Sequence, residues 1–170
     1  MNFSEYQALA RRTQNPALTT PERTLHALHG LSAEIGEVID AVACEAFYDE
    51  LGDLCWFIAE YCDALGWDMG ELEDECGRRA RIITSQAAVI DTKKNLELMT
   101  VIIGRIHGRY QKEYQGHLLL YSILKEEIKW LITAIMVIVN IERVMEENIA
   151  KLRNRYPKGF AAERSLQREE

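Results

Sequence analysis

The chain has 170 residues and a mass of 19.5 kDa, which suits one domain large enough to bury a hydrophobic core. Its net charge of −7 and pI near 5.2 argue against duplex DNA as a partner, because a protein holds nucleic-acid phosphates with clustered Lys and Arg. We therefore expect a single domain over residues 1–170 and no nucleic-acid partner.

Helical periodicity dominates the chain, and no segment shows the period-two alternation of a strand. A helix start is marked at Thr19-Thr20-Pro21-Glu22 by a Thr N-cap, a Pro and an acidic first turn. The last predicted helix begins at His117 and ends either near Ile141 or at Arg155. The sequence predicts an all-α bundle of five to six helices, over about residues 3–14, 20–44, 47–66, 69–87, 92–113 and 117–155.

The most apolar run, residues 131–141, is about half as long as a bilayer span requires, so we interpret it as a buried helix and expect no membrane association. The N-terminus lacks a basic segment followed by an apolar stretch, so no secretory signal is predicted. None of the four cysteines has CxxC spacing, and Cys55 and Cys62 can share one helix face as small hydrophobes. These features favour a cytoplasmic location.

Two acidic pairs, Glu34/Glu37 and Glu50/Asp53, carry the candidate chemistry. The residues of each pair are three apart in a predicted helix, so both carboxylates project from one face. Antiparallel packing of the two helices would gather all four carboxylates among apolar neighbours, which is unfavourable unless they are protonated or neutralised by cations. Oxygen-only ligands suit Mg²⁺ or Mn²⁺. The alternative is that both pairs are solvated helix faces, as most such pairs are.

A glycine lies inside each pair, at Gly36 and Gly52, where it weakens a helix by roughly 1 kcal/mol relative to Ala. This placement indicates that the helices approach closely there, or that a ligand needs room. Trp56 and Trp130 are interpreted as core residues, with stacking on a base as the alternative.

A second constellation lies near the C-terminus, where Asn148, Lys151 and Arg155 form one polar stripe along a predicted helix. Lys and Arg in such a stripe can hold phosphate oxygens. The alternative is a basic last turn that complements the helix dipole.

Three segments resemble the MazG-like nucleotide pyrophosphohydrolases, an all-α superfamily. They carry the pattern E–x–x–E … E–x–x–D together with N–x–x–K–x–x–x–R–Y–P–x–G–F, over about residues 25–65 and 145–168, under half of the chain. They are Gly30-Leu31-Ser32-Ala33-Glu34-Ile35-Gly36-Glu37-Val38, Asp49-Glu50-Leu51-Gly52-Asp53-Leu54-Cys55-Trp56 and Asn148-Ile149-Ala150-Lys151-Leu152-Arg153-Asn154-Arg155-Tyr156-Pro157-Lys158-Gly159-Phe160.

The resemblance implies hydrolysis of a nucleoside triphosphate between its α- and β-phosphates, giving a nucleoside monophosphate and pyrophosphate. In such enzymes the acidic pairs bind Mg²⁺ or Mn²⁺, two or more ions with substrate bound, which screen the triphosphate and lower the pKa of the attacking water. Carried over residue by residue, the metal ligands and catalytic residues are Glu34, Glu37, Glu50 and Asp53. The substrate contacts are Asn148 on the nucleotide, Lys151 and Arg155 on the phosphates, and Tyr156 as a further ligand contact.

Two departures from the family pattern matter. Many relatives have a further Glu where this chain has Ala33. Short relatives also join the helix with E–x–x–D to the motif that begins at Asn148 by one turn and part of a helix. In this chain an insert of about residues 78–143 lies between them. The displacement that puts Trp56 over Trp130 also puts Glu34, Glu37 and Glu50 over Gly108, Gln111 and Leu124.

This internal echo is either a chance alignment of helical stripes or a degenerate tandem duplication. In a duplication, one chain mimics two short subunits: the first copy supplies the metal ligands and the second supplies Asn148, Lys151 and Arg155. Such a chain needs fewer partners to close its bundle, so we expect a homodimer, with a tetramer as the alternative.

The likeness extends to phage-borne members of the family, including a branch that acts on purine deoxynucleotides such as dGTP and dATP. Asn15 could then contribute to a base pocket, and the compartment would be the host cytoplasm. Two rivals stay open. One is a dUTPase-like or phosphoribosyl-ATP-cleaving enzyme with the same metal chemistry. The other is a non-catalytic helical adaptor or regulatory module with exposed carboxylates.

Overall fold

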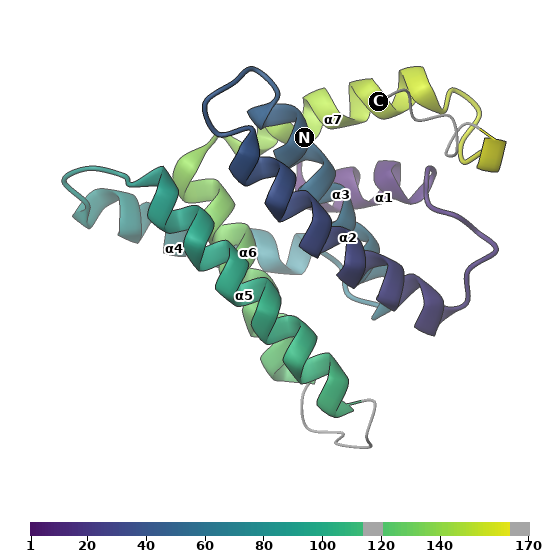
Figure 1. The fold of residues 1–170 in the computed structure, drawn as a ribbon, viewed down its shortest axis with the longest axis horizontal. Coiled ribbons are helices and arrows are strands. Elements are labelled where there is room, and N and C mark those ends of the chain that lie inside the picture. Colours follow the sequence, from purple (N-terminus) through teal and green to yellow (C-terminus); the bar gives the residue numbers. More distant parts are fainter. Residues whose placement is uncertain (114–120, 164–170) are drawn as a thin grey trace.

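The computed structural model describes residues 1–113 and 121–163, and within these ranges it contains helices and no strand (Figure 1). The all-α class is therefore confirmed, with seven helices in the described residues rather than five to six. They are α1 (Phe3–Arg11), α2 (Thr20–Asp40), α3 (Phe47–Ala64), α4 (Gly70–Gln86), α5 (Thr92–Glu113), α6 (Tyr121–Ile138) and α7 (Ile141–Arg155).

The additional helix arises because the segment predicted as the last helix holds two helices, α6 and α7; of the two predicted ends, the one near Ile141 is close to the observed end of α6 at Ile138. Asn140, between α6 and α7, has an extended backbone, and its side chain accepts a hydrogen bond of 3.1 Å from the Arg143 amide. Asn favours this N-cap role over a helix interior because its short amide competes for backbone groups. The predicted start at His117 lies outside the described residues.

The first two helices begin with capping boxes. Asn2 accepts from the Glu5 amide, while the Asn2 amide donates to the Glu5 carboxylate at 3.1 Å. The second helix begins at Thr20 with Thr19 as its N-cap, and the Thr19 amide donates to Glu22 at 2.8 Å. These reciprocal bonds satisfy amides that a helix terminus leaves without partners.

The helices pack in two interlocked groups. In one group α3 packs against α2, and in the other α6 packs against α5. The helix α4 follows α3 in the chain but packs on α6. In turn, α7 follows α6 but packs on α3. Figure 1 shows α5 beside α6 and α7 beside α1. Because α7 packs on α3, it lies against the acidic face of α3.

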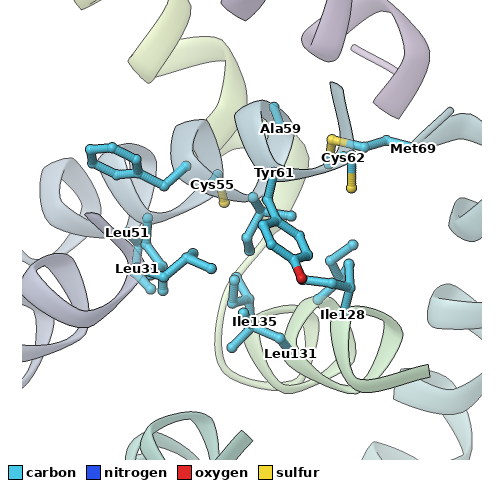
Figure 2. Close-up of a cluster of buried hydrophobic side chains, with 14 of the residues drawn as sticks. Leu31, Leu51, Cys55, Ala59, Tyr61, Cys62, Met69, Ile128, Leu131 and Ile135 are labelled. Atoms are coloured by element: carbon cyan, nitrogen blue, oxygen red, sulfur yellow. The ribbon is translucent and has the colours of Figure 1, made fainter. Parts of the chain in front are cut away.

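The core joins α3 to α6, and Figure 2 shows Tyr61 of α3 reaching toward Ile128 and Leu131 of α6. The apolar run predicted as a buried helix has this position, since most of its side chains in α6 are buried. Trp130 is an exception: it is 41% exposed, with the Arg79 guanidinium 4.6 Å from its ring centroid, so its assignment to the core was wrong. Among the described residues, no helix combines the length and apolarity that crossing a bilayer requires.

Candidate metal centre and adjoining cavity

The acidic pairs meet because α2 and α3 pack antiparallel. A Cβ atom at Gly30 of α2 would come within 2.2 Å of the Phe57 ring on α3, so the two backbones approach closely here. Toward the start of α2, the Nδ1 atom of His26 lies 2.6 Å from a carboxylate oxygen of Glu60, later in α3. Moving along α2 in the other direction therefore leads to the first turns of α3, where the second acidic pair lies.

Three of the four predicted ligands converge. Glu34, Glu50 and Asp53 each offer a carboxylate oxygen, and these three oxygens lie within 4.8 Å of one another. Glu34 is only 3% exposed, so this cluster is partly withdrawn from water. Glu37, one helical turn beyond Glu34, is exposed and outside the convergent group. An all-oxygen set of this kind is the chemistry that Mg²⁺ and Mn²⁺ take.

The electrostatics of the cluster favour a cation. Burial raises the pKa of Glu50, and the negative charges of Glu37, Asp53 and Asp49 raise it further, while Lys151 opposes them. Glu37 therefore affects the pKa of Glu50, although its oxygens stand apart from the convergent three. A divalent ion would relieve this repulsion and stabilise the ionised carboxylates.

Two of the predicted C-terminal residues contact the acidic face directly. The Lys151 ammonium lies 2.8 Å from Asp49 and 2.8 Å from Asp53. The side-chain amide of Asn148 donates a hydrogen bond of 3.0 Å to Asp53 Oδ1. Asn148 is only 2% exposed, so its amide bonds to the protein instead of facing solvent.

A residue that the sequence did not single out completes this contact. Tyr6 of α1 is fully buried, and its hydroxyl donates to Asn148 Oδ1 at 2.9 Å. Burial raises the pKa of Tyr6 well above its ordinary value, so the phenol stays protonated and can donate. No local motif marks Tyr6, because its role depends on α1 packing beside α3 and α7.

The two glycines of the acidic pairs differ. A Cβ atom at Gly52 would lie 2.9 Å from the Asn148 Cβ, so this glycine makes room for α7. At Gly36 an added Cβ meets nothing within 4 Å. The predicted close approach thus occurs at Gly52, with α7 as the neighbour, whereas at Gly36 there is only open space.

A cavity of about 220 Å³ adjoins the carboxylate cluster and shares Asp53 with it. Three residues predicted to contact substrate line it: Asn15, Arg155 and Tyr156. The other lining residues are mainly aromatic or apolar: Thr13, Leu18, His26, Trp56, Phe57, Leu152 and Phe160. The cavity thus combines polar groups of α3 and α7 with a wall of aromatic rings.

The aromatic wall is held in place by specific contacts. The Trp56 indole donates 2.8 Å to the Thr13 hydroxyl, and its ring meets Phe57 edge-on with centroids 4.9 Å apart. Tyr156 stacks on Phe160 with centroids 6.4 Å apart and planes 20° apart. Trp56 is half-buried and lines this cavity. Its position is consistent both with packing in the core and with the alternative role of stacking on a base.

The corresponding position in α6 lacks this carboxylate cluster. Glu127, which the internal echo aligns with Asp53, is buried, and Arg109 of α5 lies 2.9 Å from its carboxylate. An arginine therefore neutralises this acid from within the chain, and Gly108 and Gln111 stand where the first group has Glu34 and Glu37. In the part of the chain that the structure describes, the only group of three or more acidic, His or Cys ligands is Glu34, Glu50 and Asp53.

No family model matches the chain, and neither curated proteins nor solved structures gave a significant match.

Proposed function

We propose that this chain is a Mg²⁺- or Mn²⁺-dependent nucleoside triphosphate pyrophosphohydrolase of the MazG-like kind. The observation that carries the proposal is the convergence of Glu34, Glu50 and Asp53 within 4.8 Å beside an aromatic cavity that Asp53 also lines. Carboxylates for a cation, basic groups for phosphates and flat rings for a base are the three features that a nucleotide requires together.

At the phosphate end, Glu34, Glu50 and Asp53 would hold the cation, with Glu37 added to the set as substrate enters. A bound divalent ion supplies charge screening for the triphosphate and a lowered pKa for the attacking water. Lys151 already lies between Asp49 and Asp53. Once a cation takes over the charge of Asp53, the Lys151 ammonium can turn to a phosphate oxygen, and Arg155 reaches the same substrate from the cavity wall.

The aromatic lining of the cavity suits the nucleobase. Rings of Trp56, Tyr156 and Phe160 offer faces and edges for an aromatic heterocycle. The Asn15 side chain accepts 3.0 Å from the Ala17 amide, which fixes a polar group at the cavity where a base edge would lie. Purine deoxynucleotides such as dGTP and dATP are the substrates we propose first.

The crossed packing of α4 and α7 supports the duplicated plan. A two-subunit ancestor that exchanged its third helices would give α7 on α3 and α4 on α6, with one active centre and one that has lost its acids. We propose that the chain works as a homodimer in the cytoplasm.

The deciding experiment is a pyrophosphate-release screen of the full chain against every NTP and dNTP, with Mg²⁺, with Mn²⁺ and with EDTA. Chromatographic detection of the monophosphate identifies cleavage between the α- and β-phosphates. Activity confined to dUTP would favour the dUTPase-like alternative, and activity confined to phosphoribosyl-ATP, added to the panel, would favour the other one. Absence of both turnover and metal binding would leave the adaptor role.

A further inference from the structure

Three helices meet in one buried chain of hydrogen bonds behind the carboxylate cluster. The Tyr6 hydroxyl of α1 donates to Asn148 Oδ1 of α7 at 2.9 Å, and Asn148 Nδ2 donates to Asp53 Oδ1 of α3 at 3.0 Å. Tyr6 and Asn148 are 0% and 2% exposed. Such buried polar groups are costly unless paired, so the two bonds are expected to persist.

The chemistry of the groups fixes the direction of the chain. An ionised Asp53 only accepts hydrogen bonds, so the NH₂ end of the Asn148 amide must face it. The carbonyl end then faces Tyr6, whose protonated hydroxyl supplies the donor. Without that hydroxyl, the buried carbonyl of Asn148 would lack its partner, and the amide would lose the contact that holds its orientation.

The same bonds distinguish the two oxygens of Asp53. Oδ1 accepts from Asn148 at 3.0 Å and lies 2.8 Å from the Lys151 ammonium. With two donors on Oδ1, the second oxygen, Oδ2, is the one that Asp53 can present to a cation. The orientation of this ligand thus depends on α7, and through Asn148 on α1.

The backbone of α3 is shaped to admit this arrangement. A Cβ atom at position 52 would approach the Asn148 side chain to 2.9 Å, and the Gly52 carbonyl lies 3.4 Å from the Tyr6 hydroxyl. Any larger residue at Gly52 would push Asn148 away from Asp53. The second acidic pair therefore contains a glycine because only a residue without a side chain leaves room for Asn148.

We infer that Tyr6 is a positioning residue of the metal centre, acting through Asn148 to turn Asp53 Oδ2 toward the cation. This inference rests on the proposed metal centre but not on the reaction or the substrate. Residues that orient metal ligands without touching the metal typically change metal affinity by about 10- to 100-fold when they are replaced. Tyr6 lies in α1, far along the chain from either motif.

The test is Mn²⁺ binding to the full chain without nucleotide, measured by calorimetry and by the electron paramagnetic resonance of free Mn²⁺. Tyr6→Phe removes one hydroxyl and is expected to raise the Kd for Mn²⁺ about 10-fold or more. Tyr61→Phe is the matched control, because Tyr61 is equally buried but lies in the core between α3 and α6 (Figure 2). It should leave the Kd for Mn²⁺ within about 2-fold of the unaltered protein.

A second variant tests the route. Asn148→Ala removes the donor to Asp53 and should weaken Mn²⁺ binding by a similar factor, and Tyr6→Phe in that background should add no further loss. If a variant is destabilised, the rise in Tm with Mn²⁺ concentration still reports the affinity of its folded state.

The outcomes separate the two claims. If the unaltered protein does not bind Mn²⁺, the metal centre and the proposed function fail, and this inference fails with them. If the unaltered protein binds Mn²⁺ and Tyr6→Phe behaves like Tyr61→Phe, only the positioning role is overturned. An equal loss from Tyr6→Phe with and without Asn148 would overturn the route through that amide.

Discussion

Lys151 of α7 lies 2.8 Å from Asp53 of α3, and the same ammonium lies 2.8 Å from Asp49 one turn earlier. A residue near the end of the chain thus balances the charge of an acidic face built by its first half. This contact explains how the acids can gather in a half-buried place, because Lys151 neutralises part of their charge. Under the proposed function, a divalent ion bound to Asp53 would compete with Lys151 for the charge of this carboxylate.

Glu50→Gln should abolish turnover and leave the fold intact. The amide keeps the size of Glu50 but removes a charged ligand whose pKa is already raised by burial and by neighbouring acids. The metal-free variant should therefore be at least as stable as the unaltered protein, because a repelling charge is gone. Circular dichroism, thermal unfolding and pyrophosphate release check this, and Glu45→Gln, an exposed acid outside the cluster, is the control. Retained activity would remove Glu50 from the ligand set.

Lys151→Met should lower the free energy of unfolding of the metal-free protein by about 1–2 kcal/mol, a value between those of exposed and buried ion pairs. The loss should shrink when Mn²⁺ saturates the site, because the ion replaces the missing positive charge. The KM for the nucleotide should rise as a phosphate contact disappears. Urea unfolding with and without Mn²⁺, together with steady-state kinetics, measures these effects.

Arg143→Met is the comparison for Lys151, since Arg143 forms an exposed pair with Glu147 at 2.8 Å and its guanidinium lies over the Tyr48 ring, 5.3 Å from the ring centroid. Its loss should cost less than about 1 kcal/mol, with or without Mn²⁺. If Lys151→Met left KM and the response to Mn²⁺ unchanged, α7 would have only a structural role.

The two glycines predict opposite results for the same substitution. Gly36→Ala should stabilise the protein by up to about 1 kcal/mol, because Ala favours a helix and an added Cβ meets nothing within 4 Å. Gly52→Ala gains the same propensity but forces its Cβ against that of Asn148 at 2.9 Å, and overpacking costs typically about 1–3 kcal/mol. We expect a net loss of stability and weaker Mn²⁺ binding for Gly52→Ala only. Equal shifts in Tm for Gly36→Ala and Gly52→Ala would contradict this prediction.

Trp56→Ala should raise the KM for the preferred nucleotide by about 10-fold, the lower range expected for loss of one aromatic stacking partner. The effect should be similar for all bases if Trp56 offers only a ring face. Trp130→Ala is the control, since Trp130 is exposed on α6 under Arg79 and does not line the cavity. If Trp56→Ala and Trp130→Ala had equal KM values, the proposal that the base binds in this cavity would be contradicted.

Only one of the four thiols should react with a disulfide reagent near pH 8 in the folded protein. Cys44 is exposed, whereas burial raises the pKa of Cys55 to about 12 and that of Cys76 to about 11, and it raises the pKa of Cys62 as well. The contribution of the protonated thiols to stability is fully present below the unfolded-state pKa near 9.0 and is lost as pH rises through the folded values. Thiol counting before and after unfolding checks this, and a count of two or more in the folded state would contradict it.

Much of the local structure follows from the sequence. The all-α class, the buried apolar run and the start of α2 within one residue could be predicted because helix periodicity and capping are local properties. The two acidic pairs and the C-terminal stripe were found for the same reason, since residues three or four apart share a helix face. The break at Asn140 was only one of two predicted ends of the last helix, because apolar periodicity continues across it and only the capping preference of Asn140 marks it.

The tertiary structure decided which of these residues meet. Helix packing placed Glu37 outside the convergent oxygens, put Asn148 in a buried seat over Gly52, and brought Tyr6 and Trp56 to the site. None of these outcomes can be read from spacing along one helix, because each depends on the distance and register between helices far apart in the chain. The sequence by itself determined which carboxylate, amide and basic groups are available, whereas the packing of α7 on α3 determined which of them meet.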